Sequence, residues 1–154
     1  MNKQETYKEV HAQILAVLDG ETDITARMAT VCCLLSEAFS ETYFWTGFYS
    51  IDPKKTDELV VGPYQGSLGC LRIAFGRGVC GTAAITRETQ IVADVHALSN
   101  HIACDSRSNS EVVVPVFDKM GALIAVFDVD STSFSAFDEV DQACLEALMK
   151  SVFG

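Results

Sequence analysis

Residues 111–130, EVVVPVFDKMGALIAVFDVD, carry the pattern that decides the fold. Two runs rich in β-branched and aromatic residues, 111–117 and 122–130, flank the short segment DKMG at 118–121. Such runs favour strands, and a short polar segment with glycine favours a tight turn between them. The stretch therefore predicts an antiparallel β-hairpin.

Upstream segments predict more of the same sheet. Four further strands are expected at 42–51, 58–66, 70–75 and 89–95. Pro63 and Gly66 should end the second of these, because proline cannot donate to a sheet ladder and glycine weakens a strand. The glycine-rich turn 76–78 precedes a short helix expected at 79–87, and residues 96–110 show no period and are read as a loop.

Helical periodicity marks both ends of the chain. Apolar residues from Tyr7 to Leu18 recur at helical spacing, and a second run follows Asp23, a suitable N-cap. The segment 135–153 is the last helix, with Ser135 and Asp138 as its N-terminal capping pattern. The order predicts an α+β fold in one domain over residues 1–154, a central, mostly antiparallel sheet with N- and C-terminal helices packed on one face.

Composition excludes several functional classes. The chain has 154 residues and a net charge of -10, which disfavours binding to the phosphates of nucleic acid and to anionic membrane surfaces. The N-terminal segment has no apolar signal-peptide core, and no apolar run approaches membrane-spanning length. A cytoplasmic location is therefore expected, where cysteines stay reduced unless they are catalytic or bind metal.

Six cysteines fall into two groups. Cys32, Cys33 and Cys144 lie in helical patterns and are expected to pack as small apolar residues. Cys70, Cys80 and Cys104 lie outside those terminal helices. Their spacings of ten and twenty-four residues lack the short pairs of structural zinc sites, so zinc is disfavoured.

The chemistry of these three thiols is left open by the residues alone. Cys104 is the most suggestive, because it lies in a polar loop, HIACDS, where functional residues are common. Two hypotheses remain for these thiols: redox chemistry, and nucleophilic catalysis by Cys104 with His101 or His96 as base.

Acidic and aromatic residues add a second group of candidates. Asp128 and Asp130 are two apart in a predicted strand and therefore point to one face, and Glu111 begins the partner strand. They are either a solvated strand end or a site for a cationic group or a shared proton. Trp45 and Tyr49 also share a face, either in the core or as the wall of a small-ligand pocket.

Three stretches together resemble one family. GPYQGSLGCLRIAFGRGVCGTAA, DVHALSNHIACDSRSNSEVVVPV and IAVFDVDS are similar to the free methionine-R-sulfoxide reductases, a GAF-domain family that reduces the R-sulfoxide of free methionine. The resemblance extends over nearly the whole chain. It implies that Cys104 is the catalytic nucleophile, Cys70 the resolving cysteine and Cys80 a third, less essential one.

The same resemblance assigns the other candidates. Glu111, Asp128 and Asp130 match the acidic substrate-site residues, and Trp45 matches the aromatic residue at the methylsulfinyl end, with Tyr49 beside it. Cys104 would become a sulfenic acid, condense with Cys70 to a disulfide and be restored by thioredoxin, with no metal or organic cofactor. Members of the family are often dimers, which leaves a homodimer open.

Three other functions remain as alternatives at this point. The first is a non-catalytic GAF module that binds or senses a small ligand. The second is a cysteine hydrolase, which would have no need of Cys70, and the third is a zinc protein.

Overall fold

The computed structural model describes residues 1–102 and 104–154, and it contains a six-stranded sheet in the order β3-β2-β1-β6-β5-β4. Every neighbouring pair is antiparallel, as predicted. The strands are β1 Trp45–Asp52, β2 Lys55–Gln65, β3 Arg72–Ala74, β4 Gln90–Val92, β5 Ser110–Phe117 and β6 Leu123–Ser131. The predicted hairpin 111–130 forms β5 and β6, which occupy inner positions of the sheet.

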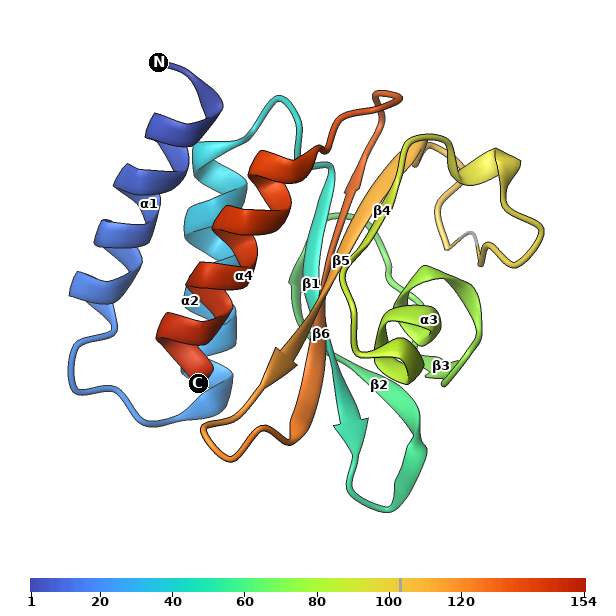
Figure 1. The fold of residues 1–154 in the computed structure, drawn as a ribbon, viewed down its shortest axis with the longest axis horizontal. Helices are drawn as coiled ribbons and strands as arrows, with labels where there is room; N and C mark the ends of the chain where they lie inside the picture. The colour runs from blue at the N-terminus through green and yellow to red at the C-terminus, as the bar shows by residue number, and fades with distance from the viewer. Residues whose placement is uncertain (103) are drawn as a thin grey trace.

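Helices cover both faces of the sheet, but unequally (Figure 1). The three long helices, α1 Lys3–Val17, α2 Ile24–Ala38 and α4 Glu139–Phe153, lie on one side. The short helix α3 Gly78–Thr86 lies on the other, and a 3-10 turn, Val95–Ala97, follows β4. The terminal helices therefore share one face, as the sequence predicts.

Two hydrophobic cores result from this arrangement. The larger fills the space between the three long helices and the sheet and includes Phe48 and Phe127, both fully buried. The smaller lies under α3 and includes Trp45, Tyr49 and Cys80. Because side chains alternate along a strand, β1 and β6 supply residues to both cores.

Three local predictions are wrong in detail. Pro63 does not end β2, because it lies where the β1–β2 register shifts between Gly47 and Tyr49, a place where proline is tolerated in a strand. Cys70 precedes β3 rather than starting it. The cap of α4 is not Ser135 with Asp138: Asp138 itself is the N-cap, in a capping box with Asp141.

The loop predicted at 96–110 is shorter in the structure, because regular elements include residues at both of its ends. Its first residues belong to the 3-10 turn, Ser110 belongs to β5, and residue 103 lies outside the described residues.

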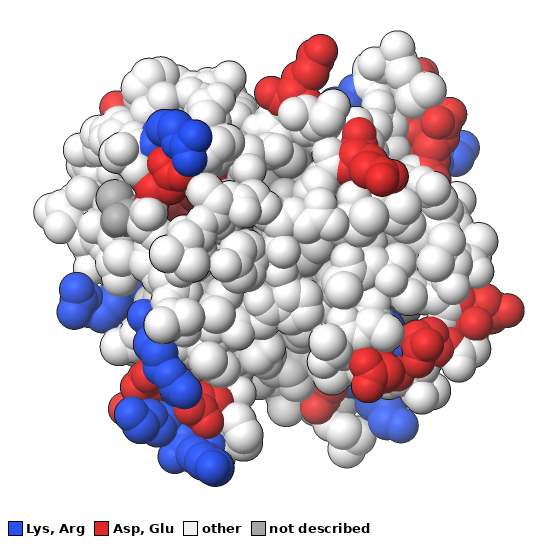
Figure 2. All heavy atoms as spheres, turned by 180° about the vertical axis from the view of Figure 1, so that it is seen from behind, with Lys and Arg blue, Asp and Glu red and all other residues white. Residues whose placement is uncertain are grey.

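Charges are mixed on the face turned away from the view of Figure 1. Figure 2 shows acidic and basic side chains together toward the edges of that face and uncharged residues over its centre. This distribution differs from the continuous basic surface that nucleic-acid binding uses. Among the described residues, no helix has the length and hydrophobicity needed to cross a membrane.

Candidate functional site

A pocket opens on the α3 side of the sheet. Two loops border it: the Cys70 loop, residues 66–71, and the Cys104 loop, residues 98–102 and 104–109. It encloses about 520 Å³, its open mouth included. Seven of the eight predicted site residues line it directly, namely Trp45, Tyr49, Cys80, Cys104, Glu111, Asp128 and Asp130. The eighth, Cys70, is bonded to one of them.

Three carboxyl groups, those of Glu111, Asp128 and Asp130, line the base of this pocket and together form its acidic wall. Glu111 on β5 is the register partner of Asp130 on β6, and Asp128 lies two residues before Asp130 on the same face. Glu111 and Asp128 are each only 5% exposed, whereas Asp130 is half-buried. Phe127 and Val129 point to the opposite face, into the larger core, as alternation predicts.

The wall favours protonated carboxyl groups. Burial raises the pKa of Glu111, Asp128 and Asp130 well above the usual value, and the charges of neighbouring carboxylates raise it further. The Oδ1 atom of Asp128 is buried and has no hydrogen-bond partner among the described residues. A buried acceptor without a donor is costly, so this atom marks a place for a donor group of a ligand.

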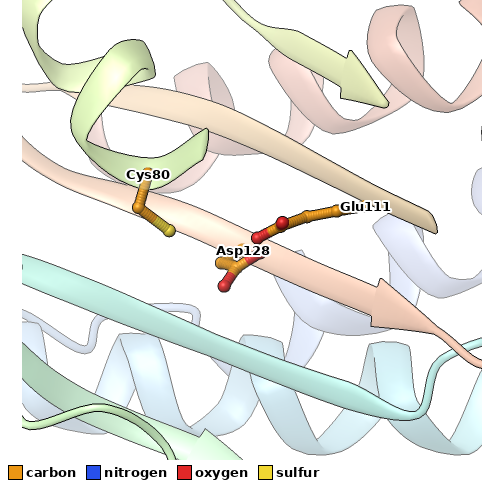
Figure 3. Close-up of side chains that lie close together, drawn as sticks. All are labelled: Cys80, Glu111 and Asp128. Carbon is orange, nitrogen blue, oxygen red and sulfur yellow. The ribbon is translucent and has the colours of Figure 1, made fainter. Parts of the chain in front are cut away.

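Cys80 approaches the acidic wall from α3. Figure 3 shows the Cys80 side chain on α3 directed toward Asp128 on β6 and Glu111 on β5. The donor atoms of the three residues lie within 4.8 Å of one another, a spacing that could hold a cation. Burial, together with the charges of Asp128 and Glu111, raises the pKa of the Cys80 thiol.

Trp45 sits in a cradle of glycines at the side of the pocket. A Cβ atom on Gly47 would lie 2.6 Å from the indole, and one on Gly69 would lie 2.7 Å from it. The indole Nε1 donates to the carbonyl of Ser67 at 2.8 Å, and the ring stacks near Tyr49 with centroids 5.7 Å apart. These contacts fix the aromatic ring in one position against the pocket.

A disulfide joins the two loops at the pocket edge. Cys70 and Cys104 are bonded, with Cα atoms 5.6 Å apart, and they are 34 positions apart in sequence. Cys104 is exposed and Cys70 is half-buried. The other four cysteines, including Cys80, are free thiols.

The comparisons with known proteins agree on the family. Residues 21–152 match the family model described as GAF domain. The free methionine-R-sulfoxide reductase of Escherichia coli is 42% identical over 97% of this chain and 87% of its own, and that of Saccharomyces cerevisiae is 37% identical over 99% and 86%. A crystal structure of the enzyme from Neisseria meningitidis in complex with its substrate is 47% identical, with a TM-score of 0.93 over 99% of this chain and 89% of that one.

The chain belongs to the GAF-domain family of free methionine-R-sulfoxide reductases.

Within this family member, the two histidines considered as bases occupy different surroundings. His101 lines the pocket, with Nε2 3.6 Å from Oε1 of Glu111, and burial lowers its pKa. His96 is exposed outside the pocket, where Nε2 lies 2.8 Å from Oδ1 of Asn109. The thiol that a hydrolase would need is bonded to Cys70 instead, so the geometry favours redox chemistry.

Cys32 and Cys144 lie in or against the core between the sheet and the long helices, as the packing interpretation predicts. Cys33 is half-buried on α2.

Several pocket residues were missed by sequence reasoning. Arg77 is the one arginine or lysine among the described lining residues, and its place in the turn GRG beside a helix start was a usable signal. Asp105 also lines the pocket, and its carboxylate accepts a hydrogen bond from Ser67, a residue of the Cys70 loop outside the pocket lining. No sequence pattern connects these two residues, which are 38 positions apart.

Proposed function

We propose that this protein reduces free L-methionine (R)-S-oxide to L-methionine through thiol chemistry. The observation that carries the proposal is the Cys70–Cys104 disulfide at the edge of a pocket whose floor is a buried acidic wall. A non-catalytic ligand-binding GAF module would have no use for that bond.

The pocket suits a small zwitterion that ends in a methylsulfinyl group. The acidic wall, with the unpartnered Oδ1 of Asp128, would receive the α-ammonium group. Arg77 would face the α-carboxylate, a group that peptide-bound methionine lacks. Trp45 and Tyr49 would pack against the methylsulfinyl end.

Cys104 is the nucleophile in this proposal. Its thiolate attacks the sulfoxide sulfur while a protonated carboxyl of Glu111, Asp128 or Asp130 gives a proton to the oxygen. The protonated oxygen is transferred to the sulfur of Cys104 as the sulfur–oxygen bond of the substrate breaks, so methionine leaves and Cys104 becomes a sulfenic acid. The three carboxyl groups share protons, so the titration belongs to the cluster.

Cys70 then resolves the sulfenic acid to the disulfide, with loss of water. Thioredoxin would reduce this disulfide by thiol exchange, and the exposure of Cys104 gives a partner thiol access to it. Cys80 would have a supporting role, since its thiol faces the acidic wall. We further propose that residues 1–154 form a single domain, which acts in the cytoplasm, alone or as a homodimer.

The test is a coupled assay with thioredoxin, its reductase and NADPH. Free methionine-R-sulfoxide should support NADPH oxidation, whereas the S-epimer and a peptide-bound sulfoxide should not. Cys104→Ser should abolish turnover, and Cys70→Ser should stop after one equivalent of methionine. Inactivity of the native protein toward all three substrates would contradict the proposal and favour a ligand-binding GAF module.

A further inference from the structure

The two loops that carry the disulfide are also joined by a hydrogen bond. The hydroxyl of Ser67 donates to Oδ2 of Asp105 at 2.7 Å. Ser67 stands three residues before Cys70, and Asp105 directly follows Cys104. A polar contact therefore lies beside the covalent one and links the same two backbone segments.

Further hydrogen bonds hold both Ser67 and Asp105 in place. The Ser67 backbone is held through its carbonyl by the indole of Trp45, at the first residue of β1. Asp105 accepts from Nε of Arg107 at 3.0 Å and from its Nη2 at 2.6 Å, and the guanidinium of Arg107 lies 4.8 Å from the centre of the Phe44 ring. Trp45 at the start of β1 thus anchors the Cys70 loop, and Phe44, the residue before β1, anchors the Cys104 loop.

Neither partner of this contact is a sulfur. It is made by a hydroxyl and a carboxylate, and hydrogen bonds from Arg107 and Ser67 hold the pKa of Asp105 below its usual value. The carboxylate therefore stays charged at neutral pH and keeps its strength as an acceptor. Neither the Ser67 hydroxyl nor the Asp105 carboxylate is consumed or changed in charge when the disulfide is reduced.

We propose that Asp105 is a positioning residue that, through Ser67, keeps Cys104 within bonding reach of Cys70 during the catalytic cycle. The inference rests on the proposed function. A disulfide requires Cα atoms within about 7 Å, and the 5.6 Å separation here is spanned by two loops that lack regular structure at both cysteines. The Ser67–Asp105 contact restricts the separation of these loops before the sulfurs bond.

The step that benefits is resolution. The Cys70 thiolate attacks the sulfur of Cys104–SOH, the sulfur–oxygen bond breaks, and the oxygen leaves as water after accepting a proton. Both sulfurs end in the disulfide, and no further oxidant is consumed. Slow resolution would leave the sulfenic acid open to further oxidation to the sulfinic acid.

The experiment uses Ser67→Ala, which removes only the hydroxyl and keeps the carbonyl that Trp45 contacts. Reduced protein is mixed with one equivalent of methionine-R-sulfoxide, and methionine, dimedone-trapped sulfenic acid and disulfide are followed in time. The control is Ser99→Ala, which makes the same serine-to-alanine change at an exposed position of the Cys104 loop. We expect methionine to form at the native rate, while disulfide formation slows about tenfold because a hydrogen bond to a charged group is lost.

A second arm separates this inference from the proposed function. Hydrogen peroxide replaces the sulfoxide as the source of Cys104 sulfenic acid, so resolution is measured without any reductase activity. Slower resolution in Ser67→Ala, with unchanged Ser99→Ala, supports positioning even if the native protein forms no methionine. Native resolution rates in Ser67→Ala in both arms, or methionine formation that slows in parallel with resolution, would overturn it.

Discussion

Glu111 on β5 lies directly opposite Asp130 on β6, so two carboxyl groups face one pocket from neighbouring strands. Like charges in that position destabilise a sheet. Burial and the charge of Asp130 raise the pKa of Glu111, which means that the folded protein retains a proton that the unfolded chain releases. The pairing of two carboxyl groups thus favours a retained proton at the place where the proposed chemistry needs a proton donor.

This arrangement predicts a pH-dependent effect of Glu111→Gln on stability. Because the carboxyl pKa is raised by folding, its ionisation lowers the stability of the native protein as pH rises above the unfolded value of about 4.3. Glutamine cannot ionise, so the variant should gain in melting temperature relative to the native protein as the pH rises above about 5. Glu9→Gln, an exposed change on α1, should show no such trend.

The same variant should lose activity. Removal of a proton donor typically costs about 10²–10⁴ in rate, and the assay with free methionine-R-sulfoxide measures it. A variant that is both less stable at high pH and fully active would contradict the assignment of a shared proton to this wall.

Gly69→Ala should impair the pocket without strain in the backbone. The new Cβ would lie 2.7 Å from Cζ2 of Trp45 and 3.3 Å from the Tyr49 hydroxyl, so the aromatic rings must shift. We expect KM for the sulfoxide to rise about tenfold, since a displaced ring loses contacts worth about 1 kcal/mol or more.

The control for Gly69→Ala is Gly121→Ala, at the β5–β6 turn. A Cβ there meets nothing within 4 Å, but φ is +80°. This variant should lose about 1 kcal/mol of stability through backbone strain and keep its KM. Equal KM values in both variants and the native protein would show that the Trp45 position is not important for binding.

Much of the site was predictable because it depends on strand periodicity. The alternation in VFDVD places Asp128 and Asp130 on one face and Phe127 and Val129 on the other, and the structure confirms this. The same rule places Trp45 with Tyr49. Periodicity is a local property, so it survives without knowledge of the tertiary structure.

Contacts between loops were not predictable from the residues. The Cys70–Cys104 pairing followed only from the family resemblance, because spacing does not determine which loops meet. The Ser67–Asp105 bond gave no signal at all, for the same reason. Pro63 was misread because its place at a register shift depends on the partner strand β1.

Tyr7→Phe should destabilise the protein and leave its catalysis intact. The Tyr7 hydroxyl donates to Oδ1 of Asp141 at 2.5 Å, and Lys3 contacts Oδ2 of the same carboxylate at 2.6 Å. Asp141 is 2% exposed, so loss of one donor leaves a buried charge less well satisfied, at a cost of about 1.5–3 kcal/mol. Urea unfolding measures the change.

Tyr43→Phe is the matched comparison for Tyr7→Phe. The Tyr43 hydroxyl bonds that of Tyr7 at 2.7 Å, a neutral pair, so its loss should cost only about 0.5–1.5 kcal/mol. Both variants should keep the native kcat/KM, because the network lies among the long helices, across the sheet from the pocket. A larger loss in Tyr43→Phe would mean that Tyr7 is not the main donor to Asp141.

Cys80 should react slowly with alkylating reagents in the oxidised protein. The residue is 4% exposed, and burial beside Asp128 and Glu111 raises the pKa of its thiol, so little thiolate is present at neutral pH. Cys33, half-buried on α2, should be alkylated at least tenfold faster, on the order expected from its greater access to solvent. Mass spectrometry of peptides after timed iodoacetamide treatment measures both rates.

Asp128→Asn gives the electrostatic part of this prediction its own test. The change removes the ionisable group whose charge contributes to the raised pKa of the Cys80 thiol and leaves the burial almost unaltered, so Cys80 should be alkylated faster while Cys33 is not. If Cys80 is alkylated as fast as Cys33 in the native protein, the pocket must open far more widely than the structure shows. If Asp128→Asn changes neither rate, burial alone protects the thiol, and the acidic wall has no influence on the sulfur that faces it.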